Sequence, residues 1–284
     1  MKSKIKRKVE LVVISDVHLG TRGCHASELL QYMKSIKPKT VILNGDIVDI
    51  WQFKKSYFPK THMQVVKQIT SWMAKGVKVY YVTGNHDEML RKFVGIKMGS
   101  LQIVNKVVLE LGDKKAWFFH GDVFDVTMQH SKWLARLGSV GYDLLIVLNR
   151  LVNNVSKRMG RGKISLSKKI KNSVKSAVKF INNFEQVAAD IGINNGYDYV
   201  VCGHIHQPEM RDVENKNGKI TYLNSGDWIE NLTSLEYNKG KWKIYRHDPS
   251  HYSLELAFKN ESHSNKELFQ LMVEEFKLLE KAAP

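Results

Sequence analysis

The chain has 284 residues, 43% of them hydrophobic, so it can bury a large core as one domain with additions. No stretch approaches the ~20 apolar residues of a membrane span, and the apolar run after the basic N-terminus is too short for a secretory signal. Two distant cysteines, Cys24 and Cys202, match no disulfide or zinc spacing and favour a cytosolic compartment, while the net charge of +16 indicates an anionic partner.

Five short apolar runs are predicted to be strands buried on both faces, as in layered α/β proteins. They span residues 11–14, 40–43, 77–82, 116–119 and 199–202. A polar cluster directly follows each run. In chain order the clusters are Asp16-Val17-His18, Gly45-Asp46 with Asp49, Gly84-Asn85-His86-Asp87, His120-Gly121-Asp122, and Gly203-His204-Ile205-His206. Because open α/β sheets gather their ligands at the carboxyl ends of strands, these clusters are expected to converge on one crevice.

The five clusters together offer carboxylates, an amide oxygen and imidazoles, but no thiolate. This donor set suits manganese, iron or zinc rather than calcium. Any one cluster alone is more often a turn capped by its own Asp or Asn. Five such clusters after five predicted strands favour a metal site.

A basic segment separates the fourth cluster from the fifth. Between 144 and 184 there are ten Lys or Arg residues and no acidic residue. Apolar residues recur there at helical spacing, and Met159-Gly160-Arg161-Gly162 divides the pattern into a hairpin. We expect an inserted helical lid at about 126–196 that meets anionic lipid; the alternative is a solvated helix pair capping the core. Arg158, Arg161 and Lys168 are its candidate substrate-binding residues.

Residues 220–284 are predicted to form strands and then a helix. Residues 220–228 indicate a strand and turn, and 235–245 indicate a hairpin around Asn238-Lys239-Gly240. Apolar residues from Leu268 to Leu279 then follow a helical period. We expect 251–284 to hold an amphipathic helix that packs on the core or on a second copy.

The order of the clusters resembles the calcineurin-like metallophosphoesterase superfamily over residues 9 to about 250. The resemblance implies an α/β fold, a four-layer α-β-β-α sandwich with two divalent ions at one edge. It also implies that Asp46 bridges the two ions. The remaining ligands would be Asp16, His18 and His206 for the first ion, and Asn85, His120 and His204 for the second.

Two cations that share a carboxylate can activate a water and clamp a phosphoryl group during in-line attack. The resemblance implies that His86 is the histidine that gives a proton to the leaving group. Asp49 would accept the other N–H of His86 and fix its tautomer. Asn85 would also contact the substrate phosphate, and Asp122 could orient His120.

Within the superfamily, the segment from Gly45 to Trp51, the His-Gly-Asp motif and the insert resemble the UDP-2,3-diacylglucosamine hydrolases of lipid A synthesis. Those enzymes usually carry Arg where this chain has His86. The resemblance implies hydrolysis of a UDP-linked acylated sugar to UMP and a lipid-sugar phosphate, with manganese as the expected metal and iron or zinc as alternatives. It also implies a cytoplasmic protein, peripheral on the inner face of the membrane.

Two other functions stay open. A metal-dependent nuclease or another phosphodiesterase would use the same ions and the +16 charge, but residues 153–179 lack the aromatics that stack on bases, so a nucleic-acid partner is not expected. A non-catalytic scaffold of the same fold would be expected to lose metal ligands. Here every ligand position is filled.

Overall fold

The computed structural model describes residues 6–51, 57–124, 181, 183–251, 264, 267–271 and 273–274. The chain forms two compact units, residues 1–121 with 189–284, and residues 122–188. Arg158, Arg161, Lys168 and most of the expected 126–196 insert lie outside the described residues. Of the second unit, the short helix η2 (Asp122–Phe124) is described, and Phe124 packs against Phe184 with ring centroids 5.4 Å apart.

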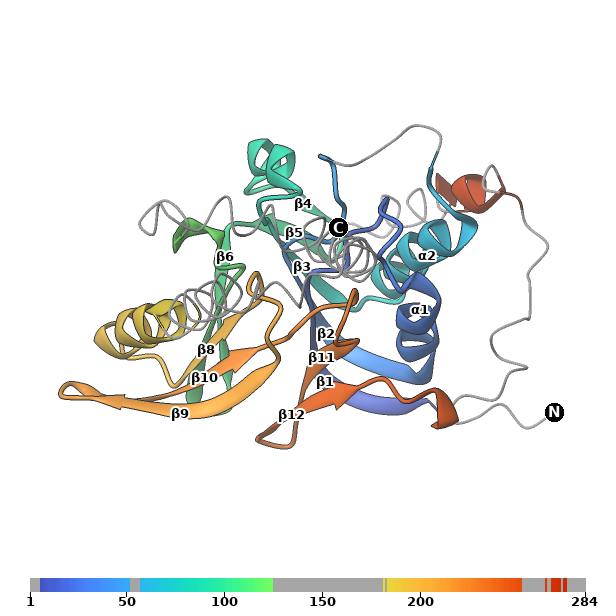
Figure 1. The fold of residues 1–284 in the computed structure, drawn as a ribbon. Helices are drawn as coiled ribbons and strands as arrows, with labels where there is room; N and C mark the ends of the chain where they lie inside the picture. The colour runs from blue at the N-terminus through green and yellow to red at the C-terminus, as the bar shows by residue number, and fades with distance from the viewer. Residues whose placement is uncertain are drawn as a thin grey trace, which may run out of the picture. The chain divides into compact units, whose positions relative to one another are not determined.

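The first unit contains a seven-stranded sheet in the order β12-β11-β1-β2-β3-β5-β4 (Figure 1). Its central strands β1, β2, β3 and β5 run parallel. The strands are β1 (Arg7–Ile14), β2 (Ile36–Asn44), β3 (Lys78–Val82), β4 (Lys97–Met98), β5 (Leu101–Val104), β11 (Thr233–Asn238) and β12 (Lys241–Arg246). The predicted hairpin is confirmed, because β11 and β12 pair up to Asn238 and Lys241. Lys239 and Gly240 both have positive φ (50° and 79°), as a tight two-residue hairpin turn requires.

A second, five-stranded sheet has the order β6-β7-β8-β10-β9. It is built from β6 (Lys106–Leu111), β7 (Lys114–Phe119), β8 (Tyr199–Cys202), β9 (Glu209–Asn215) and β10 (Gly218–Asn224). The parallel trio β7, β8 and β10 holds the buried apolar runs, and the antiparallel strands β6 and β9 form the edges. All five predicted strands are thus confirmed.

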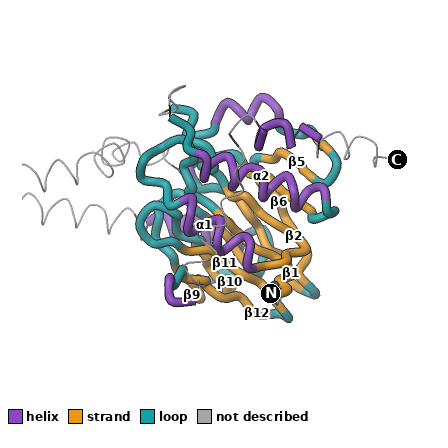
Figure 2. Tube along the Cα trace, turned by 90° about the vertical axis from the view of Figure 1, so that its right-hand side faces the viewer, coloured by secondary structure: helices purple, strands orange, loops and turns teal. Residues whose placement is uncertain are grey.

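Two cores hold the layers together. Helices α1 (Ala26–Ser35) and α2 (Lys60–Ala74) pack on one face of the seven-stranded sheet (Figure 2). The other face of that sheet meets the five-stranded sheet through a shared apolar cluster that includes Val13, Ile42 and Phe118. Residues 189–194 are helical, and Gly192 lies directly against Ile220 on the outer face of the five-stranded sheet. The expected α-β-β-α sandwich is confirmed.

The remaining described elements are short. They are the 3₁₀ helices η1 (Glu88–Phe93) and η3 (Pro249–His251) and helical residues at 267–271 and 273–274. Leu268 is buried, and the other parts of the expected C-terminal helix, residues 272 and 275–284, lie outside the described residues. No helix among the described residues is long and apolar enough to span a bilayer.

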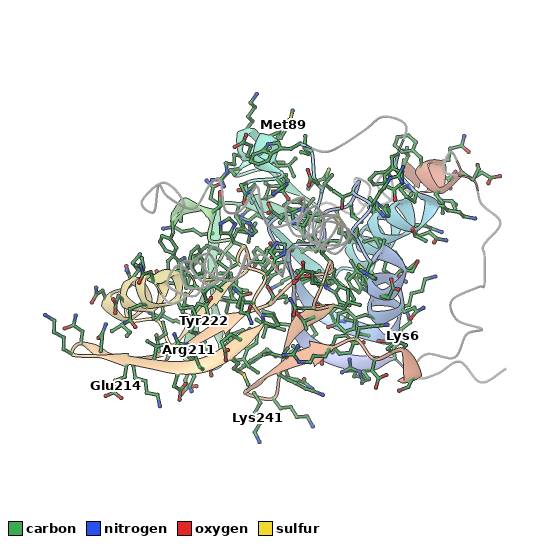
Figure 3. All side chains as sticks on the ribbon, viewed as in Figure 1. Lys6, Met89, Arg211, Glu214, Tyr222 and Lys241 are labelled. Atoms are coloured by element: carbon green, nitrogen blue, oxygen red, sulfur yellow. The ribbon has the colours of Figure 1, made fainter. Side chains whose placement is uncertain are left out.

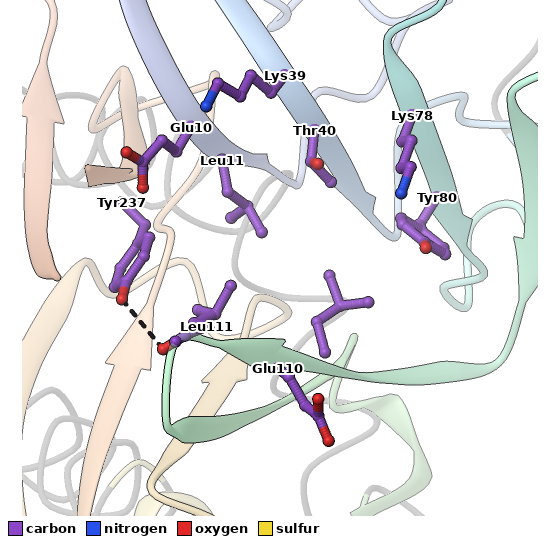
Figure 4. A pocket seen from close by; sticks show the side chains of 11 residues that line it. Glu10, Leu11, Lys39, Thr40, Lys78, Tyr80, Glu110, Leu111 and Tyr237 are labelled. Atoms are coloured by element: carbon purple, nitrogen blue, oxygen red, sulfur yellow. Dashed lines mark hydrogen bonds between the residues drawn. The ribbon is translucent and has the colours of Figure 1, made fainter. Parts of the chain in front are cut away.

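A pocket of about 340 Å³ opens between the two sheets, near the amino-terminal ends of β2 and β3 (Figure 4). Its charged and polar lining comes from Glu10, Lys39, Thr40, Lys78, Tyr80, Glu110 and Tyr237. The Tyr237 hydroxyl donates to the Leu111 carbonyl at 3.3 Å. The described lining includes no histidine, and the five polar clusters follow the carboxyl ends of their strands, away from this pocket.

Candidate metal centre

The loops after β1 and β2 are tied together by backbone hydrogen bonds. The Asp16 N–H donates to the Gly45 carbonyl (3.1 Å), and the N–H groups of Val17 and His18 both donate to the Asp46 carbonyl (2.9 Å each). The parallel pairing of β1 with β2 brings the two loops to the same edge. This places Asp16, His18 and Asp46 side by side, as expected from their strand ends.

Five of the predicted ligands have a left-handed backbone. Their φ angles are 51° for Asp16, 53° for His18, 54° for Asp46, 68° for His204 and 54° for His206. This region costs a non-glycine residue on the order of 1–3 kcal/mol, and such strain persists where the surrounding structure imposes it. Backbone strain at these five residues indicates that the fold directs their side chains toward a common point.

Glycines allow the loops to approach each other closely. A Cβ on Gly84 would overlap the carboxylate of Asp46, and a Cβ on Gly45 would overlap the ring of His120. Gly45 also has a φ of 83°, which side chains disfavour. These two positions therefore accept only glycine while Asp46 and His120 keep their places.

The ligand atoms form two main groups. Asp16, His18 and His206 make one group, and Asp46, His120 and His204 make the other, with all ligand atoms in a group within 4.8 Å of one another. His206 Nε2 lies 3.2 Å from Asp16 Oδ1, and His120 Nε2 lies 3.2 Å from Asp46 Oδ2. Asp46 also belongs to a third group with His18 and His86. Its Oδ2 lies 3.9 Å from His18 Nε2 and 3.2 Å from His120 Nε2, so Asp46 stands between one member of each main group.

Unsatisfied buried atoms in this cluster suit metal binding. Among the described residues, His18 Nε2 and Asn85 Oδ1 are buried without a hydrogen-bond partner. An unmade hydrogen bond at such an atom costs roughly 1–3 kcal/mol, and a coordinated cation would offset that cost. The His120 Nδ1–H donates to the Asn44 carbonyl (2.9 Å), which directs its Nε2 toward Asp46. The donor set therefore fits two divalent ions.

Neighbouring charges in the cluster shift the pKa values of Asp46 and His206 against the effect of burial. Burial alone would raise the pKa of Asp46, but His120 and His18 hold it below its usual range. Burial alone would lower the pKa of His206, yet Asp16 raises it to about 9. These neighbours therefore favour the ionised form of Asp46 and the protonated form of His206.

His86 and Asp49 lie together as the sequence predicts. His86 Nδ1 is 2.9 Å from Asp49 Oδ2, and the same oxygen is 3.3 Å from His18 Nδ1. Burial tends to lower the pKa of His86, but the hydrogen bond to Asp49 and the charge on Asp46 raise it above its ordinary value. Trp51, whose side chain is 58% exposed, lies against the His86 ring with centroids 4.8 Å apart.

Sequence reasoning missed the supporting role of Asp87. This fully buried carboxylate accepts the Gly84 N–H at 2.6 Å, the Ile47 N–H at 3.0 Å and the Tyr81 hydroxyl at 2.7 Å. It therefore joins the loop of Asp46 to the loop of Asn85 and His86. The fourth letter of Gly-Asn-His-Asp was visible in the sequence, but its backbone partners were not.

Asp227, after β10, was missed as well. It accepts the Ile229 N–H (2.8 Å) and the Asn231 side-chain amide (2.6 Å). Asn231 in turn donates to the His206 carbonyl at 2.8 Å, and the Trp228 N–H donates to the Asp16 carbonyl at 3.1 Å. This loop therefore holds the backbone of two predicted ligands, Asp16 and His206. Asp122 belongs to the other compact unit, so the expectation that it orients His120 stays a prediction.

Comparison with known proteins gives a consistent picture. The family model described as calcineurin-like phosphoesterase matches residues 9–208. The chain is 23% identical over 245 residues to the UDP-2,3-diacylglucosamine hydrolase of Blochmanniella pennsylvanica, covering 81% of this chain and 93% of that protein. It is 23% identical over 248 residues to the protein of the same name in Aliivibrio fischeri, covering 83% and 98%. A solved archaeal phosphodiesterase is similar with a TM-score of 0.42 and 14% identity, covering 83% of this chain and 98% of that one.

Proposed function

The chain belongs to the calcineurin-like phosphoesterases, and from this premise we propose that it hydrolyses the diphosphate of a UDP-linked acylated sugar to UMP and a lipid-sugar phosphate. That it is a metal-dependent phosphoric-ester or diphosphate hydrolase follows from the family and from the hydrolases it resembles. The finer substrate assignment rests on those relatives, which match along nearly their whole length. The position of Asp46 between His18 and His120, 3.9 Å and 3.2 Å from their Nε2 atoms, is the observation that carries the chemistry.

We assign two divalent ions to the cluster, with manganese as the proposed metal. Asp16, His18 and His206 would hold the first, Asn85, His120 and His204 the second, and Asp46 both. When bound, such a pair supplies a nucleophile from water at neutral pH and offsets phosphoryl charge. The chain's own contribution is to hold these side chains at fixed positions, which the strained loops and the Asp87 contacts support.

His86 is the proposed acid. Its Nδ1 is engaged by Asp49, so Nε2 is the ring nitrogen that can give a proton to the leaving oxygen or neutralise its charge. The raised pKa keeps this imidazole protonated nearer to neutral pH. Asp49, only 1% exposed, would keep the tautomer and the ring direction through turnover.

The proposed partner is an anionic membrane surface, at which a lipid-linked substrate would be met from the cytoplasmic side. The basic residues of 144–184, including Arg158, Arg161 and Lys168, are the proposed contacts with that surface and with the substrate's phosphates. They lie outside the described residues, so sequence composition carries this part of the proposal.

The test uses two substrates side by side. Manganese-loaded protein is incubated with UDP-diacylglucosamine and, separately, with single-stranded DNA, and products are separated by chromatography. We expect UMP and lipid-sugar phosphate from the first and intact DNA from the second. Degraded DNA together with intact UDP-diacylglucosamine would move the protein to the nucleases.

A further inference from the structure

We propose that the segment that directly follows the His86 motif docks on an anionic bilayer. This surface is here called the η1 patch. It comprises the exposed apolar side chains Met89, Phe93, Val94, Ile96 and Met98 and the exposed Lys92 and Lys97. The η1 patch is separate in sequence from the basic insert. The proposal rests on the proposed function in one respect, because it names the surface through which the metal centre meets a lipid-linked substrate.

The η1 patch concentrates exposed apolar surface. Its side chains are exposed by 55% at Met89, 48% at Phe93 and Ile96, 41% at Met98 and 39% at Val94. Eleven large apolar side chains are exposed among the described residues, and five of them fall within these ten positions. Single exposed apolar residues are ordinary, whereas a contiguous group marks an interaction site. Figure 3 shows Met89 at the outer side of η1, directed away from the sheets.

The backbone beneath the patch is hydrogen-bonded. The Leu90 N–H donates to the Asp87 carbonyl (2.9 Å), and the Gly95 N–H donates to the Ile103 carbonyl (3.0 Å). The Ile103 N–H donates to the Ile96 carbonyl at 3.1 Å. The apolar side chains thus stand on a hydrogen-bonded backbone, and a partner that covered them would remove apolar surface from water.

The basic residues of this segment favour an anionic partner. Between Glu88 and Glu110 the chain has no acidic residue and four basic ones, Arg91, Lys92, Lys97 and Lys106. Apolar side chains interspersed with basic ones along the chain match the boundary between acyl chains and anionic headgroups. Phe93 is the one aromatic residue from 89 to 109, which does not suit stacking on successive bases. The anionic bilayer therefore fits both the apolar and the charged part of the patch.

The patch is joined directly to the metal centre. Asp87 immediately precedes η1, and its carboxylate holds the Gly84 and Ile47 N–H groups of the two ligand loops. The His86 N–H, one residue earlier, donates to Asp46 Oδ1 at 2.8 Å. A bilayer that seats η1 would therefore hold the ligand loops close to the headgroups.

The test is flotation of the full chain with vesicles, with no substrate present. Vesicles of phosphatidylglycerol and phosphatidylcholine are compared with vesicles of phosphatidylcholine alone. We expect Lys92→Gln with Lys97→Gln to weaken binding to the anionic vesicles about 25-fold, because each charge near the surface contributes about fivefold. Phe93→Ser with Ile96→Ser should weaken binding to both vesicle types.

Matched controls carry the same changes elsewhere. Lys241→Gln with Lys243→Gln removes two exposed charges from β12, and Met210→Ser removes a 43% exposed apolar side chain from β9. Both should bind vesicles like the parent. All variants should keep the parent's melting temperature and its manganese-dependent hydrolysis of bis(p-nitrophenyl) phosphate, because none of these residues belongs to the metal centre.

Parent-like binding by both patch variants would overturn the proposal, as would equal losses in the controls. Loss of binding only when the lysines of 168–175 are replaced would assign docking to the insert and overturn it too. The proposed function fails separately: a protein that binds vesicles through the η1 patch but leaves UDP-diacylglucosamine intact refutes the substrate and not the surface.

Discussion

Replacing His86 separates the chemistry of a diphosphate from that of an alkyl phosphodiester. A diphosphate expels a phosphate, whose second pKa near 6 makes it a good leaving group that needs little protonation. An alkyl phosphodiester expels an alkoxide, which needs a proton. His86 is held by Asp49 at 2.9 Å and has a raised pKa. It can therefore act on the diphosphate as a cation that offsets charge, and on the alkyl phosphodiester as an acid that gives a proton.

The expected magnitudes follow from these two roles. His86→Ala should lower kcat on an alkyl phosphodiester by ~10²–10⁴, the effect of removing a general acid. On the diphosphate the loss should be about 10–10²-fold, the value of one hydrogen bond to a charged group. His86→Arg should restore most of the diphosphate activity and little of the phosphodiester activity.

The assay is steady-state kinetics on UDP-diacylglucosamine and on a methyl phosphodiester, with metal content measured for each variant. His25→Ala is the matched control, since the exposed His25 pairs with Glu28 on α1 and should leave both activities unchanged. Equal losses on both substrates that His86→Arg does not restore would refute this reasoning. They would mean that His86 only positions the phosphate.

Three other predictions concern the supports of the site. Asp87→Ala should lower the free energy of unfolding by about 3 kcal/mol, measured by urea denaturation, because it leaves the Gly84 and Ile47 N–H groups without their acceptor. Manganese affinity, measured by calorimetry, should rise about tenfold per pH unit from 7 to about 9, because metal must displace the proton that Asp16 stabilises on His206; a flat profile would contradict this. Replacing Lys168, Lys169, Lys171 and Lys175 with Gln should weaken binding to anionic vesicles about fivefold per charge in flotation while sparing a soluble phosphodiester; unchanged vesicle binding would contradict it.

Much of the site could be predicted because strand ends are local signals. Runs such as 40–43 and 199–202 are continuous in the sequence. Parallel pairing aligns the strand ends within each sheet, and the packing of the two sheets then brings Asp46 and His204 together. The short strand β4 and the half-exposed β6 were not predicted, because two residues and a weak alternation give little pattern.

The supports of the site were less accessible to sequence reasoning. Asp87 and Asp227 act through backbone N–H groups, so their partners carry no side-chain signature. The exposure of Phe93 and Ile96 was likewise hidden, because an apolar residue in a sequence is expected to be buried. Only the folded chain distinguishes an apolar surface from a core.

The most direct test of the two-ion account is the metal content per chain of the parent and of Asp46→Ala, measured together with turnover. The parent should hold two equivalents of manganese. Asp46→Ala should lose more than one equivalent and all hydrolysis, because removing the shared carboxylate leaves the two cations without the charge that both groups use. An Asp46→Ala protein that kept two ions and full turnover would contradict the account.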